Sequence, residues 1–428
     1  MKFFYLCAVV GLTALVAVKV SAEQTATNEV TLAALIADAM AHNPELNFYR
    51  AEIAAAKGDR KTATAWQNPE GEFSLGGKRA RDNAGLSGEG VAWSVSVSQT
   101  FDYPARMALR KAIANRQIEL ADNGLSQFQA SLAAKVRSLG YHLLIAQEKA
   151  DASQEVAQRG QELVDSLVQR ESAGVAPLLE KRIIEANVIS LKRKANEATK
   201  DAQNALFEIN QLRGEPLNAP LKIAKTPLKF SPLPDADELL ACARTNNFEL
   251  RQRRIELEQQ GFKVELSKKD RLPSFKVAPF YSEEKALDKE QTIGVGVSVP
   301  LPLWNRNTGN IETAKARHAQ AETSFQLAQR QVERELREQT LTYQIEQNEL
   351  TRLRPNAIEQ LREAAELGDR HYRLGSLPIA TYVELQKQYL EGLEAILDTQ
   401  ADALESLQQI ELLVGRTIES LSRKGDGK

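Results

Sequence analysis

The stretch QTIGVGVSVPLPLWNRNTGNI, residues Gln291–Ile311, decides the fold, because the periodicity of the sequence changes within it. Its first part alternates Ile or Val with Gly or Ser, which is the pattern of a strand with one apolar face and one small, polar face. No proline occurs between Asn305 and Pro355, and that segment is rich in Ala, Gln, Glu and Arg, as long helices are. The stretch is therefore a strand-to-helix junction, marked by Pro300, Pro302, Trp304 and Gly309.

A second junction of this kind lies earlier in the chain. Valine alternates with serine in an expected strand at 90–101, and a proline-free segment follows at 105–172. At about 1.5 Å per residue, this segment would form a helix of roughly 100 Å. Such a helix is too long for a compact domain, so it indicates a coiled coil or a helical tube. The sequence AGVAP at 173–177 ends it, and we expect a return helix at 178–212.

The same order of elements occurs twice, which indicates an internal duplication. Leu35, Ala39, Asn43, Glu45, Leu46, Arg50 and Glu52 recur 204 residues later as Leu239, Ala243, Asn247, Glu249, Leu250, Arg254 and Glu256. Gly174, Pro177 and Gly214 likewise recur as Gly375, Pro378 and Gly415. The fold class we expect is mainly α with a small β part, in which each unit contains a helix, a β-hairpin and a long helical hairpin.

The expected domain boundaries follow from this duplication. The first unit covers 23–213 and the second covers 236–416, with a proline-rich connector at 214–235 and a flexible tail at 417–428. We expect strands at about 70–77, 90–101, 274–281 and 291–299, with charged hairpin loops, and helix breaks, termed tips here, at 173–178 and 374–379. The second long helix is expected at 305–374, bent or broken at Pro355.

The N-terminus has the features of an export signal. A lysine, an apolar segment and a small-residue exit precede expected cleavage after Ala22, so residues 1–22 are a signal peptide; a membrane-anchoring helix is the alternative. Residues around Cys7 form no lipoprotein box, so we expect no lipid anchor. Loss of Lys2 and Lys19 changes the formal charge from −2 to −4, which does not favour nucleic acid as a partner. No later run of apolar residues is long enough for a spanning helix.

The strands have the length and alternation of outer-membrane strands. Four strands cannot close a barrel, and an open edge in lipid leaves backbone groups unpaired at a cost of several kcal/mol each, so several chains must share one barrel. Two chains give eight strands with a filled interior, whereas three give twelve strands and a wider lumen. The small residues expected to line that lumen favour the trimer; they are Ser94, Ser96, Ser98, Gly294, Gly296 and Ser298.

Two segments resemble the outer-membrane efflux protein family, the TolC-like channels, and most of all its heavy-metal branch of CzcC- and CusC-type proteins. They are PLPLWNRNTGNI at 300–311 and YRLGSLPIATYVELQKQYLEGLEA at 372–395. The resemblance implies a homotrimer with a twelve-stranded barrel in outer-membrane lipid, continued by a helical barrel in the periplasm of a Gram-negative bacterium. It also implies two partners, a periplasmic adaptor protein and an inner-membrane transporter of the resistance-nodulation-division class.

The resemblance further implies roles for residues at and beside the two tips. The tip residues are expected to meet the adaptor; they are Gly174, Val175, Pro177, Gly375, Ser376, Leu377 and Pro378. The family's acidic pair that constricts the periplasmic opening falls on Thr381 and Glu384, of which only Glu384 is acidic. Three copies of Glu384 would form a negative ring that favours cations, whereas the alternative is a solvated helix face.

No pattern of catalytic or metal-ligating residues stands out. The four histidines are scattered and no cysteine cluster exists, so we expect no metal site, no cofactor and no enzyme activity. The expected cargo, divalent cations such as zinc, cobalt or cadmium, follows from the branch resemblance. The alternatives are a channel for drugs or other small molecules, and a soluble periplasmic adaptor or coiled-coil scaffold. Dependence on detergent separates the channel from the two soluble alternatives.

Overall fold

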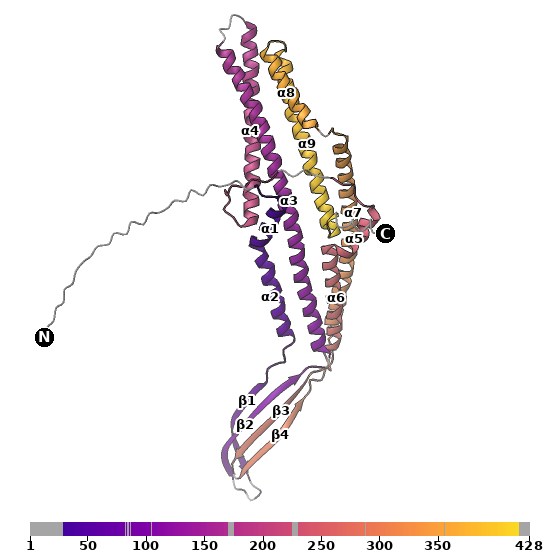
Figure 1. The fold of residues 1–428 in the computed structure, drawn as a ribbon. Coiled ribbons are helices and arrows are strands. Elements are labelled where there is room, and N and C mark those ends of the chain that lie inside the picture. The colour runs from indigo at the N-terminus through magenta and orange to yellow at the C-terminus, as the bar shows by residue number, and fades with distance from the viewer. Residues whose placement is uncertain are drawn as a thin grey trace, which may run out of the picture.

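The structure is a computed structural model that describes residues 29–418 except 82, 84, 86, 104, 170–174, 225–229, 287 and 355. The expected signal peptide, Gly174 and Pro355 therefore lie outside the described residues. The described chain is elongated, with a small sheet at one end and helices that extend away from it (Figure 1). No helix in this part of the chain combines the length and the apolar composition needed to cross a membrane.

The first unit contains two short helices, a β-hairpin and a pair of long helices. In chain order these are α1 (Leu32–His42), α2 (Glu45–Ala63), β1 (Glu70–Arg81), β2 (Ser87–Phe101), α3 (Arg106–Gln169) and α4 (Val175–Arg213). The second unit has the same order, except that its first long helix is in two parts. Its elements are α5 (Ala236–Asn246), α6 (Phe248–Lys269), β3 (Phe275–Lys285), β4 (Lys289–Ser298), α7 (Thr308–Arg352), α8 (Ala357–Arg373) and α9 (Ile379–Val414).

Both hairpins are longer than the sequence predicts. β1 continues to Arg81 and β3 to Lys285, so residues that we expected in charged loops belong to the strands. Cross-strand ion pairs explain the extension: Arg79 lies 2.6 Å from Glu89, and a second pair, Lys289 with Glu283, spans 3.0 Å. Arg79 and Glu89 are directly opposite in the ladder, and Lys289 and Glu283 are diagonal neighbours. Opposite charges at either position stabilise an antiparallel ladder, so charge alone does not identify a loop.

The second long helical segment is two helices and begins later than expected. α7 begins at Thr308 because Asn307 has a left-handed backbone, with φ at 59°, and donates its side-chain amide to the Ser267 carbonyl. α7 ends where Leu353 becomes extended, two residues before the proline. A proline lacks the N–H that a helix needs and disfavours a helical residue before it, so the helix breaks here and α8 starts anew at Ala357.

The four strands form one antiparallel sheet in the order β1-β2-β3-β4. The central pairing of β2 with β3 joins the two units, with Phe101 opposite Phe275 and Val95 opposite Tyr281. β1 and β4 are the edge strands. The sheet therefore has two long edges without a partner strand among the described residues.

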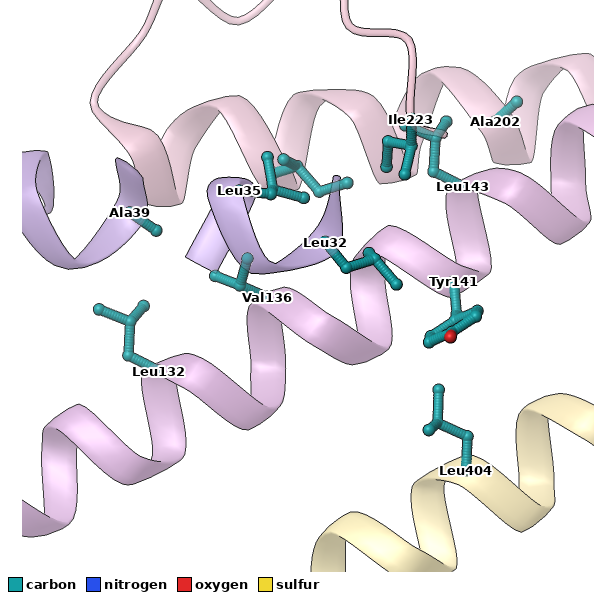
Figure 2. Packing of buried hydrophobic residues seen from close by; sticks show 11 residues of the cluster. Leu32, Leu35, Ala39, Leu132, Val136, Tyr141, Leu143, Ala202, Ile223 and Leu404 are labelled. Carbon is teal, nitrogen blue, oxygen red and sulfur yellow. The ribbon is translucent and has the colours of Figure 1, made fainter. Parts of the chain in front are cut away.

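The hydrophobic core is a series of clusters along the helices. One cluster packs Leu32, Leu35 and Ala39 of α1 between α3 and α4, with Tyr141 of α3 facing Leu404 of α9 (Figure 2). A related cluster in the second unit packs α5 and α6 against α7 and α9. It includes Ile418, which we expected in the flexible tail. A third cluster joins α3 and α4 to α8 and α9, so the two units share one helical bundle.

Candidate functional site

The sheet has two chemically different faces. Residues directly opposite each other in an antiparallel ladder lie on the same face, so the register assigns every strand residue to one of them. Ser94 pairs with Ser74 and Ser282, and their row continues to Thr292. The six residues expected to line the lumen all lie on this face: Ser94, Ser96, Ser98, Gly294, Gly296 and Ser298.

The other face is apolar and exposed in the single chain. Its side chains include Phe73, Leu75, Trp93, Val95, Val97, Ile293, Val295 and Val297, of which Ile293 is 83% exposed. The uncharged part of this face runs from Val91 to Phe101 on β2. Ten residue steps at about 3.3 Å, tilted by about 40°, give a band of roughly 25 Å, the height of the apolar band of outer-membrane barrels.

The polar face carries charged side chains that sequence reasoning missed. Lys276 lies 2.6 Å from Glu70 near the helical end of the sheet. Lys78 lies 2.5 Å from Glu284 and 2.9 Å from Glu290 near the hairpin ends. With Glu72, the strands therefore place four carboxylates and two lysines on this face. Three of the carboxylates are paired, so the face has a modest negative excess.

Gly294 has a packing role on the same face. A Cβ atom at this position would lie 2.7 Å from the ring of Phe280, the residue opposite it in the ladder. The aromatic ring therefore covers the glycine, a pairing that compensates for the missing side chain within a strand. The polar face therefore carries one large aromatic ring, Phe280, beside the small residues predicted to line the lumen.

The second tip is a tight turn that exposes Leu374, a large apolar residue, together with Gly375, Ser376 and Pro378. Gly375 has φ at 74°, and the backbone N–H of Ser376 donates to the His371 carbonyl, 3.0 Å away. Leu377 is half-buried and packs on a cluster that includes Tyr382, whereas Leu374 is 74% exposed. The side chains of Val175 and Pro177, in the first turn of α4, lie outside what the structure describes.

The candidate gate residues Thr381 and Glu384 lie one turn apart on α9 and are both exposed. Tyr382 between them is fully buried and stacks on Tyr372, with ring centroids 5.0 Å apart. Burial raises the pKa of the Tyr382 hydroxyl well above its usual range. Glu384 accepts a hydrogen bond from Gln388 at 2.7 Å. The buried tyrosine fixes the helix rotation, so it also fixes the direction of the two exposed side chains.

Ion pairs between α3 and α8 were also missed by sequence reasoning. Arg159 of α3 lies 3.3 Å from Glu366 of α8, and Arg373 of α8 lies 3.5 Å from Glu162 of α3. The Asp369 carboxylate, followed by Glu162, raises the pKa of the Arg373 guanidinium. These contacts join helices about 200 residues apart in the sequence, where the spacing of charges along one helix carries no signal. These ion pairs hold α8, which leads into the second tip, against α3 of the first unit.

The described residues contain no cluster of three or more His, Cys, Asp or Glu side chains arranged to hold a metal ion. Two of the four histidines form local hydrogen bonds. His42 bonds Asp38, four residues earlier in α1, and His371 bonds Ser376 in the second tip. These histidines therefore contribute to helix ends and turns.

Comparison with known sequences identifies the family. The sequence model of the outer membrane efflux protein family matches residues 35–215 and 239–416, one match in each unit. The chain belongs to the outer membrane efflux protein family. As a member of it, the efflux protein lies in the outer membrane and extends into the periplasm.

A curated relative supports the heavy-metal branch. The efflux protein is 24% identical to the cobalt-zinc-cadmium resistance protein CzcC of Cupriavidus metallidurans over 294 residues, which cover 68% of this chain and 67% of the relative.

Solved structures share the fold. The CusC structure is 13% identical, with a TM-score of 0.70 and coverage of 91% of this chain and 93% of CusC. The CmeC outer membrane channel of Campylobacter jejuni is 15% identical, with a TM-score of 0.73 and coverage of 92% and 89%. The mainly helical fold with a small sheet is therefore that of outer-membrane channels, as the sequence predicts.

The strand-to-helix junction of the efflux protein is an exposed apolar segment. Trp304 is 93% exposed, Leu301 70% and Leu303 62%. Pro300 and Pro302 are exposed in the same link between β4 and α7. Gly309 lies in the first turn of α7, and a Cβ atom there would meet open space.

Proposed function

We propose that the efflux protein is the outer-membrane channel of a tripartite efflux system that exports divalent heavy-metal cations. The observation that carries this proposal is the sheet, which is apolar on one face, polar on the other and open at both edges. An open edge in lipid leaves backbone N–H and C=O groups unpaired, so β1 of one copy pairs with β4 of the next. Three copies close a barrel of twelve strands, whose polar faces line the lumen.

The helices continue this barrel into the periplasm. α3 contains 64 residues, which at 1.5 Å per residue extend about 96 Å from the sheet to the region of the first tip. The start of α4, in the first tip, and the second tip, between α8 and α9, lie at the end of the molecule opposite the sheet (Figure 1). The periplasmic adaptor binds at these tips and connects the channel to an inner-membrane transporter of the resistance-nodulation-division class. The exposed Leu374 supports this contact, because an adaptor would cover it.

Glu384 is the proposed gate residue. Three copies of this exposed carboxylate, one from each protomer, form a negative ring at the periplasmic opening and favour cations. Thr381, on the same side of α9, contributes a neutral hydroxyl. The gate therefore has one carboxylate per protomer, and the negative excess on the polar face of the sheet continues the cation preference into the barrel.

The proposed cargo rests on the likeness to CzcC, which is named for cobalt, zinc and cadmium resistance. We propose no metal-binding, cofactor-binding or catalytic residue for the channel, because tight binding of the cargo would slow conduction.

The cargo is tested by deleting the gene and measuring growth on a panel of metal salts and a panel of organic toxicants. Loss of tolerance to zinc, cobalt or cadmium alone, restored by the wild-type gene, supports metal export. Loss of tolerance to organic compounds alone contradicts it and favours a channel for small molecules. Expression of the gene under the test conditions is the necessary control.

A further inference from the structure

We propose that the strand-to-helix junctions form an interfacial belt that binds anionic phospholipid headgroups of the periplasmic leaflet. The proposal rests on the outer-membrane position of the sheet and adds a lipid contact at its helical end. The belt comprises aromatic and leucine side chains and an adjoining set of basic side chains: Trp66, Phe101, Tyr103, Phe275, Leu301, Leu303 and Trp304, with Arg60, Lys61, Lys269, Arg271 and Arg306.

The aromatic part of the belt is continuous with the apolar face of the sheet. Phe101 and Phe275 are opposite each other at the last rung of the β2-β3 ladder and stack with centroids 5.3 Å apart. Trp66, in the link from α2 to β1, forms an edge-to-face contact with Phe101, with ring centroids 6.0 Å apart, and is 64% exposed. These rings therefore end the apolar band where the chain leaves the membrane.

Trp304 belongs to the link from β4 to α7, and this link begins at the helical end of the sheet (Figure 1). It is 93% exposed, a large cost in water for an indole ring with two exposed leucines beside it. Indole rings are favoured at membrane interfaces, because the ring is apolar and its N–H is polar. The third tryptophan, Trp93, lies on the apolar face near the opposite boundary, with Tyr281 at 5.3 Å. All three tryptophans of the chain therefore lie near a boundary of the band.

The basic part of the belt points to an anionic surface. The last turn of α2 contains Arg60 and Lys61, and the last turn of α6 contains Lys268 and Lys269. Each of the two helices that lead into the sheet therefore has two cations in its last turn. Lys268 is paired with Glu265. Such residues also favour a helix C-terminus through its dipole, but that effect does not extend to residues outside the helices.

Two arginines outside the helices strengthen this argument. Arg271 and Arg306 are exposed and form no ion pair with the described residues. The neighbouring carboxylates are engaged elsewhere: Asp102 pairs with Arg110 at 2.7 Å, and Asp270 pairs with the buried Arg106 at 3.2 Å. Five belt cations therefore exceed the two nearby exposed carboxylates that form no ion pair with the described residues, Asp59 and Glu312; Glu70, Glu265 and Asp270 are exposed but paired. Lipid phosphates supply the missing negative charge, and the acyl chains cover the apolar residues.

The first experiment measures the depth of Trp304. The full chain carrying Trp66→Phe and Trp93→Phe, with Trp304 as its only tryptophan, is inserted into phosphatidylcholine vesicles brominated either near the headgroup or near the chain end. We expect bromines near the headgroup to quench Trp304 fluorescence more strongly than deep bromines. Absence of quenching by either lipid would overturn the proposal, because the ring would then lie in water or between copies of the chain.

A second variant separates failure of the belt from failure of the channel. Trp66→Phe with Trp304→Phe keeps Trp93 on the apolar face of the sheet. If Trp93 is quenched and Trp304 is not, the sheet is inserted and only the belt is wrong. If neither tryptophan is quenched, the proposed channel is contradicted as well.

The headgroup preference is measured in mixed vesicles in which either phosphatidylglycerol or phosphatidylcholine carries the bromine. We expect brominated phosphatidylglycerol to quench Trp304 more, and Arg271→Gln with Arg306→Gln to lower this preference by about fivefold for each cation removed. The control, Arg330→Gln with Arg352→Gln, removes two exposed cations from α7 and should leave the preference unchanged. Equal quenching by the two lipids in the Trp304 protein would overturn the anionic part of the proposal.

Discussion

At the scale of single residues, the duplicated positions repeat the same contacts. Asn43 and Asn247 are buried, and each accepts a backbone N–H at the start of the following helix. Each also donates to a carbonyl at the end of a return helix, Leu212 at 3.0 Å and Leu413 at 2.8 Å. The side chain caps one helix and satisfies the last turn of another, which explains why the same residue occupies both places.

Gly415, the C-cap of α9, is one of the least replaceable of these residues. Its φ is 71°, and a Cβ atom would lie 2.4 Å from the Asn246 carbonyl oxygen. We expect Gly415→Ala to destabilise the fold by about 2 kcal/mol or more, because both the backbone angle and the space oppose it. Gly309→Ala, in open space within a helix, should be neutral or slightly stabilising. Thermal unfolding followed by circular dichroism tests the pair, and equal melting temperatures would contradict the account.

Glu346 gives a pH-dependent prediction. Burial raises the pKa of its carboxyl, and the charges of Asp402, Glu405 and Glu349 raise it further. A raised acid pKa in the folded state means that ionisation of Glu346 lowers the free energy of unfolding. This loss of stability is complete above the raised pKa and disappears as pH falls through the ordinary value of 4.5. We expect Glu346→Gln to raise the melting temperature at neutral pH and to have little effect near pH 4.5. A gain independent of pH would refute this explanation.

At the scale of elements, the second tip contains one exposed apolar residue and one packing residue. Leu377 belongs to the packing that holds the α8-α9 turn together, whereas Leu374 is exposed in the single chain. The sequence places both in one turn, LGSLP, and its pattern does not distinguish them. The difference arises from the turn geometry, in which Gly375 reverses the chain between them.

This separation leads to a paired test of adaptor binding. Leu374→Glu should abolish efflux in a complementation assay while the melting temperature and oligomer remain as in wild type, because the change affects only an exposed contact. Leu377→Glu should lower the melting temperature, because it buries a charge against Tyr382 and its neighbours. Full efflux activity in Leu374→Glu would show that this side chain is not at the adaptor contact.

The element order could be predicted from sequence, whereas the charged contacts between elements could not. The alternation in 291–299 and the absence of proline at 105–172 and at 305–354 are local sequence patterns, and such patterns predict strands and helices directly. The ends of the hairpins were missed because Arg79 and Glu89 have the composition of a loop until they pair. Arg159 and Glu366 were missed because their contact depends on how α3 and α8 pack. On the polar face of the sheet, the alternation of strand residues predicts that all six small residues lie together, but it does not reveal the ring of Phe280 over Gly294.

At the scale of the whole molecule, a single copy leaves so much apolar surface and unpaired strand backbone exposed that we expect several copies to assemble. The sheet presents two open edges and an apolar face, and the long helices expose isoleucine and leucine side chains that neighbouring copies would bury: Leu179, Ile183 and Ile189 on α4, and Leu327, Leu341 and Ile345 on α7. Lipid covers the apolar face of the sheet, but lipid cannot satisfy strand edges. Assembly of several copies meets both requirements at once.

The most direct test of this account is the conductance of the purified protein in a planar bilayer, measured together with its mass in detergent. We expect a trimer that forms discrete, weakly cation-selective channels, with the selectivity reduced by Glu384→Gln and unchanged by Glu338→Gln, which removes an exposed carboxylate from α7. Unchanged cation selectivity in Glu384→Gln would contradict the proposed gate role of Glu384, but not the proposal that the protein is a channel. A monomer that stays dispersed without detergent and forms no channels would contradict the central claim.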